Sequence, residues 1–220
     1  MSGTVRVLAP LEVFETLRFD PDEGYVRLDL HLARLADSCA AFGLPLALDR
    51  LRSSLAARAP AGPARIRIGV AEGGAAPVIQ AFDLAPDATA WRVAVHESRV
   101  DEGEIWRAHK TNRRELYDEA REALPEGLDE WLFLNGAGEV CEGSITNVFL
   151  RREGRLITPP VAAGALPGVL RRALIETGRA IVAPLSLSDL TGSPEGLFVG
   201  NSLRGLIPAT LVSPGVSDRS

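Results

Sequence analysis

The period of the apolar residues changes twice within the first 84 residues, from strand to helix and back to strand. Residues 13–19 alternate apolar and polar side chains, as a half-buried strand does. Residues 21–24 contain the turn formers Pro, Asp and Gly, and residues 25–28 resume the strand pattern. This part of the chain therefore predicts a β-hairpin.

Helical spacing follows the predicted hairpin. Asp29 is the expected N-cap of a helix over about 30–42, and a second helix is expected over about 48–57. Residues 64–70 and 78–82 then alternate again as strands. The combination of a few strands with two helices predicts an α+β layer.

Residues 84–88 are the best candidate for a connector between domains, because Pro and Asp interrupt the strand pattern and no apolar period crosses them. We therefore expect a small N-terminal α+β domain over 1–84, a connector over 85–90 and a C-terminal domain over 91–220.

The second half predicts more strands than helices. Strands are expected over 92–95, 131–134, 139–150 and 155–157. A helix is expected over 112–124, with its buried face formed by Leu116, Ala120 and Leu124.

Composition excludes several classes of function. The 220 residues are 46% hydrophobic and 24% charged, with a net charge of −5 and no basic block, so nucleic acid is not an expected partner. Cys39 and Cys141 have neither metal-ligand spacing nor the frequency of a disulfide framework. No signal sequence and no apolar run near the roughly 20 residues of a membrane span are present. A cytoplasmic protein without metal or membrane partners is expected.

Lys110 is the first candidate for chemistry, because it is the only lysine in the chain. A desolvated amine can lose its proton and attack a carbonyl carbon, whereas a guanidinium cannot. Glu142 is the second candidate, because it is a carboxylate within an otherwise apolar and hydroxyl-bearing strand. A buried carboxylate needs a partner, although alternation alone allows the solvent side equally.

Two loops are candidates for ligand binding. Gly168 directly precedes a helical pattern, and the free N–H groups at a helix start can hold a phosphate. Residues 200–205 place amide, hydroxyl and guanidinium groups in a loop bounded by glycines.

Taken together, these segments resemble the class IV aminotransferases, the fold-type IV enzymes that use pyridoxal 5'-phosphate (PLP). The resemblance extends over about 14–208, and the 32 positions between Lys110 and Glu142 (142 − 110) fit it. The segments that support it are 14–18, 31–35, 109–111, 142–149, 158–159, 166–171 and 201–205.

The resemblance implies a two-domain α+β fold like that of D-amino acid aminotransferases, with a small α/β first domain and a larger, β-rich second domain with helices. It implies that Lys110 bonds to PLP and moves the substrate α-proton, and that Glu142 keeps the ring nitrogen protonated. The other implied cofactor contacts are Arg34, Asn147, Gly168, Val169, Leu170, Asn201 and Ser202. The implied substrate contacts are Thr16, Arg107 and Arg204.

The short chain and the 201–205 loop look more like the 4-amino-4-deoxychorismate lyases of folate biosynthesis, which release pyruvate and 4-aminobenzoate. An aminotransferase of the branched-chain or D-amino acid type stays open, because Lys110 and Glu142 serve both reactions. An inactive PLP-fold binding subunit is a third reading, disfavoured by the presence of both residues. The resemblance also implies a homodimer with a small-molecule substrate.

Two residues depart from the family pattern. Leu170 stands where amino acid aminotransferases often carry a hydroxyl, and Arg113 stands where an uncharged polar residue is common. The first departure removes a side-chain contact to phosphate, and the second changes a wall of the expected active site.

Overall fold

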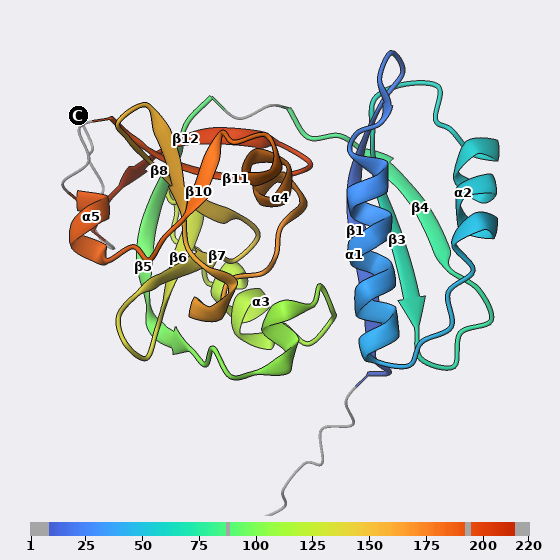
Figure 1. The fold of residues 1–220 in the computed structure, drawn as a ribbon, viewed down its shortest axis with the longest axis horizontal. Helices are drawn as coiled ribbons and strands as arrows, with labels where there is room; N and C mark the ends of the chain where they lie inside the picture. Colours follow the sequence, from blue (N-terminus) through green and yellow to red (C-terminus); the bar gives the residue numbers. More distant parts are fainter. Residues whose placement is uncertain (1–8, 87–88, 192–194, 214–220) are drawn as a thin grey trace, which may run out of the picture.

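The structure is a computed structural model that describes residues 9–86, 89–191 and 195–213. Its strands form a small sheet, in the order β2-β1-β3-β4, and a large sheet, in the order β10-β9-β8-β11-β12-β5-β6-β7 (Figure 1). The sequence between the sheets contains the expected connector, of which residues 87 and 88 lie outside the described residues. The α+β fold class is confirmed, whereas the division into two domains stays a prediction.

The small sheet and its two helices share one apolar core. The elements are β1 (Glu12–Asp20), β2 (Gly24–Tyr25), α1 (Leu28–Ala41), α2 (Leu48–Ala57), β3 (Ala64–Ala71) and β4 (Val78–Asp83). β1 alternates buried and half-buried residues along its whole length, so one face packs on the helices. The other face carries Phe14 and Thr16 toward the large sheet.

The helix start differs from the prediction. The returning strand is only Gly24–Tyr25, and α1 begins at Leu28. Its N-cap is Arg27, a left-handed residue with φ 56° that makes no side-chain capping bond, and Asp29 lies in the first turn instead. Asp29 there still favours the helix, because a negative charge near the N-terminus interacts well with the helix dipole.

The large sheet closes on itself. β7 pairs with β8 as well as with β6, which joins the two ends of the run β8-β11-β12-β5-β6-β7. Its strands are β5 (Trp91–Val100), β6 (Glu130–Asn135), β7 (Val140–Gly143), β8 (Asn147–Arg152), β9 (Arg155–Thr158), β10 (Ala180–Val182), β11 (Leu197–Asn201) and β12 (Gly205–Leu211). The helices around it are η1 (Ile105–Ala108), α3 (Glu115–Glu122), η2 (Val161–Ala163), α4 (Val169–Glu176) and α5 (Leu187–Thr191).

α3 is shorter than predicted, and Tyr117 joins the face that was predicted to be buried. It spans Glu115–Glu122, and its buried residues are Tyr117 and Ala120, while Leu116 and Leu124 are half-buried. The helix starts late because Asn112 donates its amide to the Glu12 carbonyl of β1 (2.9 Å). No helix among the described residues is long and apolar enough to cross a membrane.

Candidate active site

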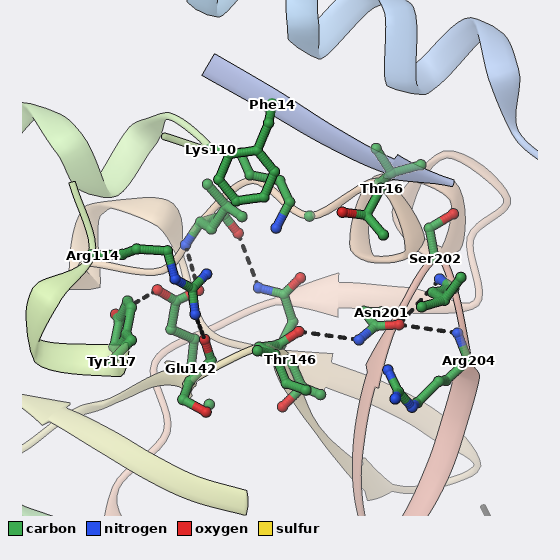
Figure 2. A pocket seen from close by; sticks show the side chains of 18 of the residues that line it. Phe14, Thr16, Lys110, Arg114, Tyr117, Glu142, Thr146, Asn201, Ser202 and Arg204 are labelled. Carbon is green, nitrogen blue, oxygen red and sulfur yellow. Dashed lines mark hydrogen bonds between the residues drawn. The ribbon is translucent and has the colours of Figure 1, made fainter. Parts of the chain in front are cut away.

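A cavity of about 560 Å³ lies between the two sheets. One wall comes from β1, α1 and β3, and the other comes from the loop before α3, from β7, from the start of α4 and from the β11–β12 turn. All of the predicted site residues line this cavity except Leu170. Figure 2 shows Lys110 and Glu142 on one side and Ser202 and Arg204 on the other.

Lys110 is held in place by β1. The Phe14 amide donates a hydrogen bond to the Lys110 carbonyl (2.9 Å), and Thr111 forms a β-bridge with Val13. The Lys110 Nζ lies 4.7 Å from the centre of the Phe14 ring. Burial, together with the charges of Arg34 and Arg114, lowers the pKa of Lys110 to about 7. A large fraction of the amine is therefore unprotonated, and nucleophilic, near neutral pH.

Glu142, on β7, faces the cavity with both oxygens held. The Tyr117 hydroxyl donates to Oε1 (2.6 Å), and the Leu166 amide donates to Oε2 (2.9 Å). Burial raises the pKa of Glu142, while these two hydrogen bonds and the charges of Arg107 and Lys110 oppose that rise. Tyr117 was not predicted, because the apolar period of this helix was assigned to Leu116, Ala120 and Leu124 alone.

Arg34 is fixed by a buried carboxylate. Its Nε and Nη2 bond to Oε1 and Oε2 of Glu15 (2.6 and 2.7 Å), and its Nη1 donates to the Pro167 carbonyl (3.2 Å). His31 extends this network, because Nδ1 contacts Glu15 (2.7 Å) and Nε2 contacts the Ser202 hydroxyl (2.8 Å). Glu15 and His31 lie within segments singled out in the sequence but were not assigned a role.

Glu15 should dominate the acid sensitivity of the fold. Burial alone would raise its pKa, but Arg34 and His31 outweigh burial and lower it to about 2. Since this value lies below that of the unfolded chain, the stabilisation is present above about pH 4.5 and is lost as the pH falls toward 2. We expect Glu15→Gln to lower the free energy of unfolding at pH 7 by about 3 kcal/mol.

Urea unfolding at pH 7 and pH 3 measures this effect. The matched control is Glu12→Gln, because the Glu12–Arg67 pair is about a quarter exposed and should contribute about 1 kcal/mol or less. Equal losses in the two variants, or an unchanged acid dependence in Glu15→Gln, would contradict the assignment.

The start of α4 contributes backbone donors. Its N-cap is Gly168, where a Cβ would collide with the Asn147 side-chain oxygen, so only glycine lets Asn147 lie against the helix start. Asn147 Nδ2 donates to the Leu166 carbonyl (2.9 Å). The first amides of a helix have no acceptor within the helix, and Val169 lines the cavity. The Leu170 side chain packs into the core, so only its amide can serve a ligand.

The β11–β12 turn is shaped by Asn201. Its Oδ1 accepts the amides of Leu203 (3.1 Å) and Arg204 (3.0 Å), and its Nδ2 donates to the Ile145 carbonyl (3.1 Å). Asn201 therefore connects this turn with the 144–146 turn as well as lining the cavity.

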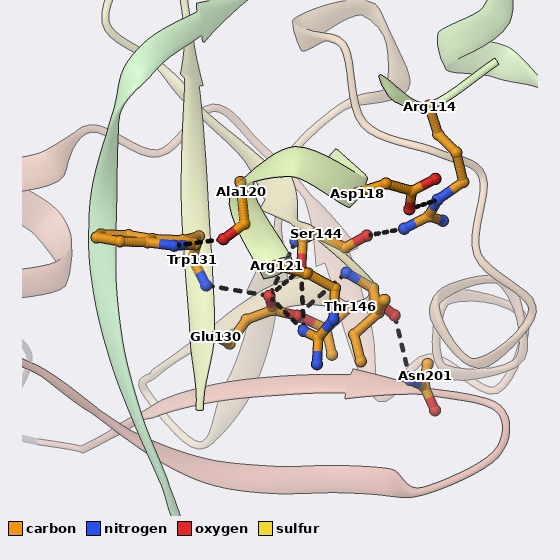
Figure 3. A network of polar contacts seen from close by, with 10 residues as sticks. Arg114, Asp118, Ala120, Arg121, Glu130, Trp131, Ser144, Thr146 and Asn201 are labelled. Atoms are coloured by element: carbon orange, nitrogen blue, oxygen red, sulfur yellow. Dashed lines mark hydrogen bonds and ion pairs between the residues drawn. The ribbon is translucent and has the colours of Figure 1, made fainter. Parts of the chain in front are cut away.

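Glu130 is a second buried carboxylate that the sequence analysis missed. It is fully buried at the start of β6 and accepts hydrogen bonds from the Ile145 amide (3.1 Å), the Thr146 hydroxyl (3.0 Å) and both the amide and hydroxyl of Ser144 (Figure 3). Arg121 lies beside it. The sequence could have indicated this burial, because Glu130 directly precedes an apolar strand segment. This cluster holds the 144–146 turn that forms the cavity floor.

Comparison with known proteins identifies the family. The family model for amino-transferase class IV matches residues 12–212. A crystal structure of a putative amino-acid aminotransferase from Mesorhizobium loti matches with a TM-score of 0.85 and 40% identity, covering 92% of this chain and 100% of that chain. A 4-amino-4-deoxychorismate lyase from Pseudomonas aeruginosa gives a TM-score of 0.77 at 24% identity, covering 92% and 83%, which is a likeness of fold alone.

A shorter stretch matches curated proteins. A probable branched-chain-amino-acid aminotransferase from Aquifex aeolicus is 44% identical over 87 residues, which are 37% of this chain and 28% of that protein. The matches to the first three curated relatives span less than a third of their lengths.

The chain belongs to the class IV aminotransferase family. Members of this family are PLP enzymes, and PLP is the cofactor of this chain. The residues of the cavity fit this cofactor. An amine of lowered pKa, a buried carboxylate, an arginine and the free amides of a helix start meet there, which are the partners that an aldehyde, a ring nitrogen and a phosphate require.

Proposed function

We propose that this chain catalyses a PLP-dependent reaction at the amine-bearing carbon of a small carboxylic acid. The observation that supports it is the presence of the Lys110 amine and the Glu142 carboxylate in one cavity of about 560 Å³. The retention of both residues argues against an inactive binding subunit.

Different residues of the cavity would bind the cofactor and transfer the proton. Bound PLP supplies an electron sink for the bonds of the amine-bearing carbon. Lys110 would hold the cofactor and would take the proton from that carbon, for which a pKa of about 7 is well placed. Glu142, oriented by Tyr117 and Leu166, would pair with the ring nitrogen. Arg34 and the first amides of α4 would bind the phosphate, with Ser202 beside them.

For the reaction, we favour 4-amino-4-deoxychorismate lyase. The products, 4-aminobenzoate and pyruvate, together contain all the atoms of the substrate, so no second substrate is needed. Supporting this choice, the cavity is lined by many more arginines than carboxylates, and aminodeoxychorismate carries two carboxylates. An amino acid aminotransferase is the second candidate, supported by the names of the Mesorhizobium loti and Aquifex aeolicus relatives.

Product analysis separates the two candidates. We expect the PLP-loaded protein to release pyruvate and 4-aminobenzoate from aminodeoxychorismate without an added oxo acid. The parallel assay offers L- and D-amino acids with 2-oxoglutarate or pyruvate. Transamination of an amino acid without lyase products would favour the second candidate. Absence of activity in both assays would contradict both candidates.

We also propose that the chain forms a homodimer. Two copies of the chain would pair so that each cleft lies near the small sheet of the partner, and light scattering would reveal a monomer if this is wrong. We further propose that the protein is located in the cytoplasm and that its two domains are joined by residues 85–90.

A further inference from the structure

The cavity is lined by an excess of cations. Among the residues that the structure describes, only Asp83 and Glu142 contribute carboxylates to its lining, against Lys110 and seven arginines. The arginines are Arg34, Arg65, Arg107, Arg113, Arg114, Arg121 and Arg204. Four of these pair with a carboxylate, Arg34 with Glu15, Arg107 with Glu104, Arg114 with Asp118, and Arg121 with Glu130. Arg113 donates to the Ala9 carbonyl (2.7 Å).

Arg65 and Arg204 are different. Within residues 9–86, 89–191 and 195–213, neither guanidinium forms a salt bridge. Arg65 lies over the Phe82 ring (4.4 Å) and Arg204 lies over the Trp91 ring (5.7 Å). Stacking on an aromatic face orients a guanidinium and leaves the N–H groups at its edge free to donate.

Arg121 completes a group with these two. It comes from α3, whereas Arg65 comes from β3 and Arg204 from the β11–β12 turn. Arg121 Nη1 donates to the Ser144 hydroxyl (3.1 Å) and lies 3.4 Å from Glu130. Burial lowers the pKa of Arg204, and the positive charges of Arg121 and Arg65 lower it further. All three line the same cavity, and the charges of Arg65 and Arg121 both act on Arg204.

The group is separated from the reacting end of the cavity. In Figure 2, Thr146 and Asn201 lie between Arg204 and Glu142. The partners expected for the cofactor phosphate, Arg34 and Ser202, belong to the network of Glu15 and His31 and not to this group. A ligand that fills the cavity would therefore meet Lys110 with one end and the three arginines with the other.

We propose that Arg65, Arg121 and Arg204 form a subsite for a second carboxylate of the substrate, distant from its amine. The inference rests on the proposed function in that a substrate amine lies near Lys110. A carboxylate there would accept the donors of Arg65 and Arg204 that the aromatic rings leave free, and its charge would offset the repulsion that Arg204 meets from the other two arginines. The substrate class is accordingly a dicarboxylate that bears an amine, and branched-chain amino acids, with one carboxylate, would leave the subsite unfilled.

Binding of an unreactive ligand tests the subsite without turnover. The PLP-loaded protein is titrated by calorimetry with isophthalate, which has two carboxylates and no amine, and with 3-carbamoylbenzoate, in which an amide replaces one carboxylate. We expect isophthalate to bind about tenfold or more tightly than the amide, because a charge-assisted bond is replaced by a weaker one. In Arg204→Gln and Arg65→Gln this preference should fall to about threefold or less.

Arg155→Gln is the matched control, since Arg155 is exposed on β9 and does not line the cavity. It should keep the full preference. Arg121 is left unchanged, because its removal would leave the buried Glu130 carboxylate without its positively charged partner. Equal affinity for the two ligands in the natural protein, or the same preference in Arg204→Gln as in Arg155→Gln, would overturn the subsite. So would inorganic phosphate competing with isophthalate at equal affinity, because the site would then bind any anion.

Failure of the proposed function looks different. If borohydride cannot fix PLP to Lys110, or if the protein converts no amine, the proposed function is wrong. The preference for isophthalate can still be measured in that case. If the protein converts amines but shows no preference for the dicarboxylate, only the proposed subsite is wrong.

Discussion

Lys110→Ala should fold normally and form no borohydride-reducible link to PLP. The reason is that Lys110 is the only lysine of the chain, so the substitution removes the one side-chain amine that can bond to the cofactor. Turnover should fall by about 10²–10⁴-fold from the loss of the proton-transferring group alone. Mass spectrometry of the reduced protein locates the adduct on a single peptide.

Lys110→Arg is the control for charge. It keeps a cation beside Phe14 but offers no nucleophile, so it should behave as the alanine variant does in the reduction assay. Circular dichroism and urea unfolding check that both variants are folded. A reduced adduct of undiminished yield in Lys110→Ala would show that the cofactor is attached elsewhere, or not covalently at all.

Glu142→Gln should retain PLP and lose on the order of 10²–10³-fold in turnover, the range seen when one electrostatic partner of a reacting centre is removed. A neutral amide cannot stabilise a proton on the ring nitrogen. In addition, the Tyr117 hydroxyl and the Leu166 amide bond to different carboxylate oxygens, so one of these donors would face the amide nitrogen of glutamine, which is itself a donor. The measurements are kcat and the absorption spectrum of the bound cofactor.

Tyr117→Phe separates these two causes. It removes one donor but leaves the carboxylate and its charge, so its effect on kcat should be clearly smaller than that of Glu142→Gln. If Glu142→Gln turns over at a near-normal rate with an unchanged spectrum, Glu142 does not face the ring nitrogen.

Much of the fold could be predicted from local pattern. The second helix has the predicted limits, Leu48–Ala57, and β1, β3 and β4 lie within about a residue of the expected strands, whereas the returning strand β2 ends three residues early. The predicted helix over 112–124 is present but shorter, because its start depends on Asn112 pairing with Glu12, a contact across 100 positions that no helical period reports. The α1 cap was wrong because Arg27 adopts a left-handed conformation, which residue type alone does not predict.

The candidate site shows the same limit. Lys110 and Glu142 were found because each is unusual in its own segment, as the only lysine and as a carboxylate in an apolar strand. Glu15, His31 and Tyr117 look ordinary in sequence, since a strand carboxylate, a helix histidine and a helix tyrosine are commonly exposed or structural. Their roles come from partners on other elements, so only the folded chain reveals them.

The backbone bond between Phe14 and Lys110 means that the lysine is not carried by the large sheet alone. The main chain at Lys110 and Thr111 pairs with β1 at the edge of the small sheet. A rotation of one sheet relative to the other would therefore either move Lys110 together with β1 or break the hydrogen bond between Phe14 and Lys110. A substitution in β1 that shifts Phe14 is therefore expected to shift the Lys110 main chain as well, although it leaves the large sheet unchanged. The rate of amide exchange at Phe14, compared with its β1 neighbours, reports how tightly the two halves move together.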